Sequence, residues 1–413
     1  MKSLRNLFML VALLAVPAFA QELTSDINLT VLDSSGNPIS GASASVTFEP
    51  TNSTASKSTS SSGSVAFRGL RPGGPYTIEV SYGGNSESLS NVSLTVGDTF
   101  RSKVTLTSGS LEEIVTVASK LNTNKDIGFS TSISSDDISK FSSVTRDLKD
   151  FVRLNPWSVA NDASDGQDAE LSIGAGGSRT NDILVDGASY NDDFGLNASG
   201  YPGQASPINL DSIEQLNVRV APSSIEYSNF EGGVIEIVTK GGTNEFKGSI
   251  YSYDRGDSFV GDSVDGRDID QEFDDTSEGF SIGGPIIKDK AFFFVAFESN
   301  DKTTPINYGP VGSGAPFTQP ITIEQVRQIQ SDTQSVYGFD PLLYSSSNSV
   351  TNENTTLRLD FILDDNHRLQ VNYRETDSEA LRGSNSNPFN YYFPSNEYLK
   401  PEMTESDGFL LVS

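Results

Sequence analysis

The chain has 413 residues, with 28 Lys and Arg against 55 Asp and Glu, which gives a formal net charge of −27. It contains no cysteine and a single histidine, His367. Disulfides, thiolate nucleophiles, Cys-ligated zinc and multi-histidine metal sites are therefore excluded. A chain this acidic is also a poor candidate for nucleic-acid binding, because duplex affinity depends on cations that neutralise phosphates.

Composition favours strands and loops over helices. Only 35% of the residues are hydrophobic, yet the chain carries 36 Gly, 24 Phe and 14 Tyr. Aromatic residues are enriched in strands, and glycine marks turns. We therefore expect a mainly β protein, and the length predicts two to four domains.

The N-terminus has the three parts of a secretory signal in order. Lys2 and Arg5 precede the apolar run 7–16, and an A-x-A motif ends at Ala20. We expect cleavage between Ala20 and Gln21, and hence export. The apolar run is too short to span a bilayer, which takes about 20 apolar residues.

The next segment alternates short apolar strands with turn residues, which is typical of a small β-sandwich. It contains V-x-D-x-x-G-x-P-I-x-G-A from Val31, G-x-V-x-F-x-G-L from Gly63 and G-x-Y-T-I-x-V from Gly74. These strings resemble the carboxypeptidase-regulatory-like domain, a resemblance that implies a non-catalytic sandwich. Another immunoglobulin-like module is the alternative.

A small polar hinge within 108–120 leads into a short β-prone run with acidic residues before it and no partner strand nearby in the sequence. Such a run is suited to pairing with the sheet edge of another protein, because main-chain hydrogen bonds give affinity with little demand on sequence. The alternative is a first strand packed in the following domain. The run consists of Glu113, Ile114, Val115, Thr116 and Val117.

The following domain is expected to mix helix and strand. The range 134–154 has apolar residues at roughly helical spacing, with Ser135 as the expected cap. Strands with tight glycine turns come next. Three strings stand out, S-R-x-N-D-I-L-V-D-G at 178–187, I-N-L-D-S-I-E-Q-L-N-V at 208–218 and G-G-V-I-E-I-V-T-K-G-G-T-N-E-F-K-G-S at 232–249.

Together these strings resemble the plug of a TonB-dependent outer-membrane receptor, and the phrase N-L-D-S-I-E-Q within 208–218 points to the Oar-like subgroup. The resemblance implies that residues 113–117 are the TonB box. It also implies that TonB, with its inner-membrane energising complex, is the partner. The location implied is the outer membrane of a Gram-negative bacterium, with the N-terminal domains in the periplasm.

From Phe246 onward the apolar residues recur with a period of two. Leu369, Val371 and Tyr373, for example, alternate with Arg368, Gln370, Asn372 and Arg374. Alternating segments joined in turn by tight turns and long loops are typical of a transmembrane β-barrel facing lipid outside. A soluble antiparallel sheet with one wet face is the alternative. About six strands are predicted, whereas plugged transporters use about 22, so we expect the N-terminal part of a longer receptor.

The expected organisation is mainly β: a signal peptide (1–20), a regulatory-like β-sandwich (21–108), a TonB box with an α/β plug domain (109–244), and an incomplete transmembrane β-barrel (245–413). The acidic stretch 262–275 and the helix expected at 322–336 are assigned to outer loops; calcium binding by the former is conceivable, but the EF-hand order is missing.

The expected function is energy-coupled passage of an unidentified substrate. An outer-membrane adhesion or assembly protein that is not coupled to TonB is the alternative. No G-x-S-x-G nucleophile motif occurs in the chain, so neither an enzyme nor a cofactor is expected.

Overall fold

The structure is a computed structural model. It describes residues 24–106, 129–143, 145–161, 170–192, 197, 199–203, 205–225, 227–257, 263–264, 267–268, 274–305, 308–315, 317–338, 347–364, 367–380 and 402–412. The expected signal cleavage site at Ala20 and Gln21 and the expected TonB box at 113–117 lie outside these residues.

The N-terminal domain is a sandwich of two sheets around one apolar core. Side chains at alternate positions of each inner strand are buried, as with Ile27, Leu29 and Val31, all at most 1% exposed. One sheet has the order β4-β1-β7 and the other β3-β2-β5-β6. The strands are β1 Ser25–Asp33, β2 Ser43–Phe48, β3 Ser53–Ser58, β4 Ser64–Leu70, β5 Gly73–Tyr82, β6 Asn85–Leu94 and β7 Thr99–Leu106.

The predicted β-sandwich is therefore present, with one strand that the sequence pattern missed. β3 has the sequence STASKS, which contains no large apolar residue, and its side chains are mostly exposed. It is held as an edge strand by antiparallel pairing with β2, from Ser43↔Ser58 to Phe48↔Ser53. Main-chain pairing leaves no periodic apolar signal in the sequence.

The middle domain is built on a five-stranded mixed sheet with the order β12-β11-β14-β13-β8. The central strands β14 and β13 are buried on both faces, because helices and a small hairpin cover one side. The strands are β8 Phe129–Ser134, β11 Asp182–Val185, β12 Ala188–Ser189, β13 Ile213–Val220 and β14 Gly233–Thr239, and the hairpin is β9 Ser158–Asn161 with β10 Glu170–Ile173.

The helix expected over 134–154 is two short helices instead of one. α2 Ser135–Lys140 and α3 Lys149–Val152 are two separate elements. The cap of α2 is Ser134 and not Ser135, because the Ser134 hydroxyl accepts from the Asp137 amide while the Asp137 carboxylate accepts from the Ser134 amide. This reciprocal pair is a capping box, which fixes the start one residue earlier than the sequence suggested.

A third unit is a six-stranded antiparallel sheet with the order β15-β18-β19-β22-β23-β24. The alternating segments predicted from the sequence are strands of this sheet, which has the six strands expected, and strands that follow one another in the sheet are neighbours. The strands are β15 Lys247–Gly256, β18 Asp274–Ile287, β19 Ala291–Pro305, β22 Ser347–Ile362, β23 Arg368–Ala380 and β24 Glu402–Val412. In the described part of the chain this sheet is open, with β15 and β24 at its edges.

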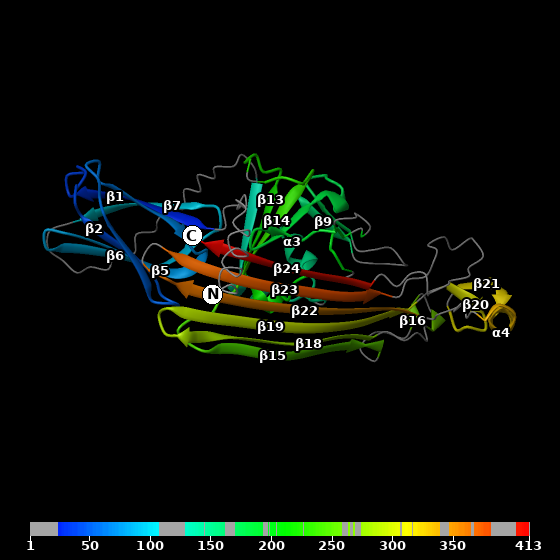
Figure 1. Ribbon diagram of the computed structural model, residues 1–413. Helices are drawn as coiled ribbons and strands as arrows, with labels where there is room; N and C mark the ends of the chain where they lie inside the picture. The colour runs from blue at the N-terminus through cyan, green and yellow to red at the C-terminus, as the bar shows by residue number, and fades with distance from the viewer. Residues whose placement is uncertain are drawn as a thin grey trace, which may run out of the picture.

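The three units are stacked around the long sheet (Figure 1). The middle domain lies on one face of the six-stranded sheet, and the N-terminal sandwich lies at the end where the tight turns join β18 to β19 and β22 to β23. None of the helices among the described residues has the length and apolar character to cross a bilayer.

A small lobe extends from the opposite end of the sheet (Figure 1). It contains β20 Tyr308–Val311, β21 Phe317–Thr322 and α4 Ile323–Tyr337. The helix expected at 322–336 is thus confirmed, with Thr322 in a capping box at its start and Gly338 in a left-handed conformation at its end. The acidic stretch 262–275 includes two short strands, β16 Ser263–Val264 and β17 Arg267–Asp268; the described residues contain no cluster of acidic or histidine side chains able to hold a metal.

Packing between β14 and the β9–β10 hairpin depends on the Gly232-Gly233 pair. A Cβ on Gly232 would lie 2.1 Å from the Ile173 carbonyl oxygen, whereas a Cβ on Gly177 would have no neighbour closer than 3.5 Å. We expect Gly232→Ala to destabilise the middle domain by about 1–3 kcal/mol through overpacking, and Gly177→Ala to leave it unchanged. Denaturant unfolding of both variants measures this, and equal midpoints would contradict the packing argument.

Candidate functional site

The candidate site is the face of the six-stranded sheet that the middle domain covers, called here the inner face. Besides the apolar Phe292, Phe294 and Ala296 of β19, it carries polar or charged side chains that are almost fully buried, at 1–4% exposure. They come from alternate positions on three neighbouring strands, Glu298 on β19, Asn352, Asn354, Thr356 and Arg358 on β22, and Asn372, Arg374, Thr376 and Ser378 on β23. Burying so many polar groups is tolerated only where each finds partners.

The Asp186 cluster is the first place where those partners come from the middle domain. Asp186 accepts from Arg374 Nη1 at 3.1 Å, and Arg374 Nη2 donates to the Val185 carbonyl at 2.9 Å. Arg358 Nη1 donates to the Thr239 carbonyl at 2.7 Å and lies 4.0 Å from Asp186. Two arginines of the sheet therefore bind the middle domain at and beside the turn that contains Asp186.

The chain around Asp186 is shaped for this contact. Asp186 and Gly187 both have left-handed backbones, with φ of 46° and 78°, which is the conformation that an Asp-Gly hairpin turn needs. The Asp186 carboxylate also accepts from the Thr239 amide at 2.8 Å and from the Thr239 hydroxyl at 2.7 Å. These hydrogen bonds hold the β11–β12 turn against the end of β14 within the middle domain.

A second ionic group, the Arg146 cluster, lies nearer β15. Arg146 Nε donates to Glu298 at 3.0 Å, and its Nη2 donates to Asp211 at 2.9 Å. The guanidinium lies 4.2 Å from the ring centre of Tyr251, whose hydroxyl donates to Glu298 at 2.6 Å. One cation from the middle domain therefore satisfies a glutamate that is 1% exposed on the inner face.

Neutral hydrogen bonds join the two clusters across β22 and β23. The Tyr190 hydroxyl donates to Thr376 Oγ1 at 2.9 Å, and Asn354 Nδ2 donates to the Ser206 carbonyl at 3.0 Å. Asn352 Nδ2 donates to the same carbonyl at 3.3 Å. The contact that β22 and β23 make with the middle domain is thus polar, and water can replace such bonds if the units separate.

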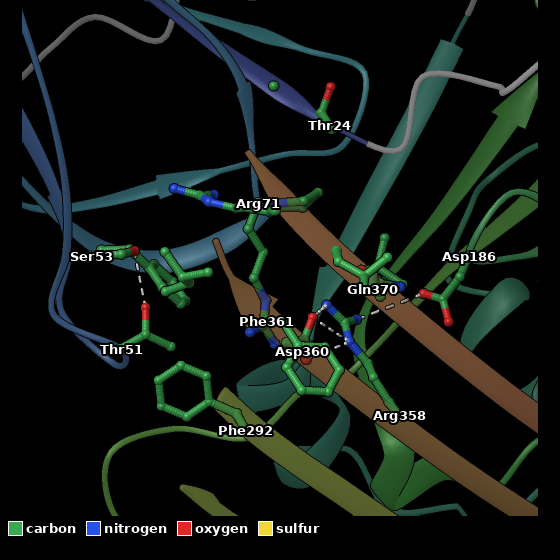
Figure 2. Close-up of a pocket in the computed structure, with 17 residues that line it drawn as sticks. Thr24, Thr51, Ser53, Arg71, Asp186, Phe292, Arg358, Asp360, Phe361 and Gln370 are labelled. Atoms are coloured by element: carbon green, nitrogen blue, oxygen red, sulfur yellow. Dashed lines mark hydrogen bonds and ion pairs between the residues drawn. The ribbon is translucent and has the colours of Figure 1, made fainter. Parts of the chain in front are cut away.

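At the tight-turn end, a cavity of about 80 Å³ lies where all three units meet. Figure 2 shows Arg71 of the N-terminal sandwich projecting toward Asp360 of β22, with Arg358 and Asp186 beyond it. Arg358 donates to Asp360 from Nε at 2.9 Å and from Nη2 at 2.8 Å. Burial and the neighbouring charge of Arg358 both lower the pKa of Arg71.

A buried ion pair inside the middle domain lies on its sandwich-facing side. Arg219 of β13 donates from Nε to Glu236 of β14 at 3.1 Å, and both side chains are at most 7% exposed. Burial raises the pKa of Glu236; the charge of Arg219 opposes the rise, and that of Asp98 adds to it. Without its arginine this carboxyl would be a costly charge in the interior.

The period-two segments of the sequence sort in the structure as expected. Asn372 and Arg374 point into the inner face and are 3% exposed. Tyr373, between them, is 41% exposed on the opposite face. The alternation predicted from this strand is therefore real, and its polar side is covered by the middle domain.

Family models match three successive parts of the chain. Residues 26–107 match the Carboxypeptidase regulatory-like domain, residues 123–235 the TonB-dependent Receptor Plug Domain, and residues 238–313 an Outer membrane beta barrel domain. These are the domains of a TonB-dependent receptor. The resemblance found in the sequence is confirmed, and the units are named below as the regulatory-like domain, the plug and the barrel sheet. The chain is located in the outer membrane, with the N-terminal domains on the periplasmic side.

Two curated relatives are similar in sequence. The TonB-dependent transporter Oar of Myxococcus xanthus is 33% identical over 137 residues, which are 31% of this chain and 12% of that protein. The probable TonB-dependent siderophore receptor PirA of Acinetobacter baumannii is 29% identical over 188 residues, 43% of this chain and 23% of that protein. The chain thus matches less than a quarter of the length of either relative.

Two solved structures align with a larger part of this chain. The siderophore receptor PirA from Acinetobacter baumannii aligns over 63% of this chain and 33% of its own, at 19% identity and a TM-score of 0.44. The outer membrane transporter YddB from Escherichia coli aligns over 62% of this chain and 33% of its own, at 12% identity and a TM-score of 0.45.

Sequence reasoning did not single out the residues that join plug and barrel sheet. Asp186 was quoted within a plug motif and Arg374 within an alternating strand, but nothing paired them across 188 positions. A signal was available, since Arg358 is a charge between Leu357 and Leu359, and Glu298 directly follows the apolar run 291–297. Such charges indicate a covered polar face, although they do not identify their partners.

The Asp186 cluster makes a stability prediction. Asp186→Asn leaves Arg374 and Arg358 buried without their shared anion. We therefore expect the free energy that holds the plug against the barrel sheet to fall by about 3–5 kcal/mol. The measurement is the urea concentration at which the plug becomes accessible to protease in the detergent-solubilised protein. Asp136→Asn, which breaks the exposed pair with Lys140, is the control and should leave the midpoint unchanged.

The Arg219–Glu236 pair predicts a pH dependence. Arg219→Met removes the opposing cation, so the folded-state pKa of Glu236 rises further above its unfolded value. A carboxyl of this kind stabilises the fold when protonated, and that contribution is lost as pH rises through the folded pKa. We expect the stability deficit of Arg219→Met to shrink as pH falls from neutral toward the unfolded pKa of a glutamate, as measured by urea unfolding.

The control for this pH dependence is the double variant Arg219→Met with Glu236→Gln. It has no carboxyl to titrate at this position, so its deficit relative to Glu236→Gln alone should not vary with pH. A deficit of the single variant that is equal at every pH would show that Glu236 is not the titrating group.

Proposed function

We propose that the receptor carries out energy-coupled passage of a substrate across the outer membrane, with TonB supplying the force. The observation that carries this proposal is the contact that the Asp186 and Arg146 clusters make between the plug and the barrel sheet, called here the polar seat. Ion pairs at Asp186 and Arg146 hold the plug against the barrel sheet, and the apolar core of the plug includes no residue of that sheet. A seat of this kind is stable at rest, and it can be hydrated and moved when force is applied.

The opposite face of the barrel sheet supports contact with outer-membrane lipid. Ile250 is 88% exposed, Ile282 44% and Phe280 41%, and all three point away from the plug. The described strands of this sheet are 10 to 16 residues long, enough for the 9–11 residues that a tilted transmembrane strand takes. An apolar exterior around a polar, plugged interior is the arrangement of an outer-membrane transporter.

The proposed point of attachment for TonB is the run Glu113–Val117, between the regulatory-like domain and the plug. In this proposal TonB adds a strand to the run, with Ile114, Val115 and Val117 supplying alternate side-chain contacts and Thr116 a hydrogen bond. Support comes from position, because the run lies between β7, which ends at Leu106, and β8, which begins at Phe129. TonB works in this proposal with its inner-membrane energising complex, and an extracellular substrate binds at the outer end.

A substitution at the centre of the run tests the attachment. Val115→Pro removes one backbone donor and restricts the chain, so we expect uptake to be lost while substrate binding is retained. Val115→Thr keeps the donor and the β-branched shape and should transport normally. The measurement is uptake beside equilibrium binding, both on intact cells. Parental uptake by the proline variant would refute the assignment.

The alternative is an outer-membrane adhesion or assembly protein that uses the regulatory-like domain for binding and does not couple to TonB. Capture of the full chain on the immobilised periplasmic domain of TonB distinguishes the two. Capture that Val115→Pro abolishes and Val115→Thr preserves favours the transporter. Absence of capture by the parental chain favours the alternative.

A further inference from the structure

The regulatory-like domain is bound to the plug through both main-chain polar groups of one residue. The amide of Val96 donates to Gln215 Oε1 at 3.0 Å, and its carbonyl accepts from Arg219 Nη2 at 2.8 Å. Val96 is fully buried, and both plug side chains come from one strand, β13. These three residues are called here the Val96 clamp.

The two side chains of the clamp are also bound inside the plug. Gln215 Nε2 donates to Ser132 of β8 at 3.1 Å, and Arg219 Nε donates to Glu236 of β14 at 3.1 Å. The clamp geometry therefore requires β8, β13 and β14 to keep their register. A plug that loses β8, or shifts β14, no longer presents both groups to Val96.

Two glycines of the regulatory-like domain allow its close approach to β13. A Cβ on Gly97 would lie 2.9 Å from Arg219 Nη2, and a Cβ on Gly73 would lie 2.7 Å from Glu214 Oε1. Side chains at these positions would push into the plug. The surface of the domain is thus shaped to the plug strand that it contacts.

The same domain also reaches the barrel sheet at its tight-turn end. The Pro50 carbonyl accepts from the Asn244 amide at 2.8 Å, just before β15 begins. The Arg71 guanidinium lies 5.4 Å from the Phe48 ring centre and projects into the cavity lined by Asp360 and Arg358 (Figure 2). The domain thus touches the plug and the rim of the sheet together, and it fits them only while they keep their present relative position.

We propose that the regulatory-like domain is a docking module that binds the seated plug and is released when β8, β13 and β14 rearrange. Its position then reports the state of the plug to the periplasm. Because linkage is reciprocal, docking must also stabilise the seated plug by the same free energy. The inference goes beyond the transport proposal, since docking requires neither TonB nor a substrate.

Docking can be measured as a distance in the full chain. The chain has no cysteine, so Ser88→Cys on β6 and Lys288→Cys on the β18–β19 turn place two spin labels at exposed positions without background. We expect one narrow distance distribution in the parental protein in outer-membrane vesicles. A broad distribution there would overturn the proposal.

Gly97→Ala tests the interface, and Gly41→Ala provides a matched control. Both glycines have left-handed backbones, with φ of 71° and 76°, so alanine strains the domain similarly at either site. A Cβ at Gly41, however, has nothing within 4 Å. We expect Gly97→Ala to raise the undocked population roughly tenfold, a free-energy change within the range of typical coupling energies, and Gly41→Ala to leave the distribution narrow. Equal broadening in both would overturn the proposal.

The reciprocal effect has its own readout. Undocking by Gly97→Ala should speed hydrogen exchange at the amides of β8, whose partner strand carries the clamp, by a similar factor. Amides of β11, on the far side of the sheet, serve as the internal control and should be unaffected. Unchanged exchange in β8, in a variant whose domain is undocked, would show that the domain does not bind the plug's seated state.

Discussion

A buried charge must keep its partner, and in this protein the partners are divided between two folded units. Asp186 belongs to the plug, whereas Arg374 belongs to the barrel sheet, and each is 3% exposed. The same division holds for Arg146 and Glu298. Separation without water would leave uncompensated charges, so the plug stays seated. Separation with water replaces each bond, so seating is reversible.

The polar contact with the plug also explains why the two faces of the barrel sheet differ in character. On β23, Asn372 and Arg374 face the plug, while Tyr373 faces outward. Because side chains alternate strictly along a strand, a shift of register by one residue would place arginines on the apolar side and aromatics against the plug. The ion pairs with the plug therefore help to specify the register of the strands that hold it.

The regulatory-like domain extends this network to the periplasmic side. Its hydrogen bonds to the plug are made to β13, which pairs with both β8 and β14. Val96 of the domain is bonded to Gln215 and Arg219 of β13, and these two side chains are in turn bonded to β8 and β14. A rearrangement of the plug sheet and the release of the domain are thus parts of one equilibrium, with no need for a separate signal path.

Local patterns in the sequence predicted most of the elements. Period-two alternation located most of the long strands, the helical spacing of Ile323, Val326 and Ile329 located α4, and apolar alternation located the sandwich. The polar strand β3 was not predicted, because its main-chain pairing with β2 leaves no apolar pattern in the sequence. The helix at 134–154 was overestimated, because the start chosen by the capping box and the break after α2 depend on hydrogen bonds and packing that spacing does not encode.

The sequence by itself determined the order of the three domains and the two faces of each barrel strand, because both follow from motifs and periodicity along a continuous stretch. Only the tertiary structure decided which charges meet. Asp186 and Arg374 are 188 positions apart, and Val96 and Arg219 are 123 positions apart. Contacts over such separations are set by how folded units pack, and no local pattern of residues records them.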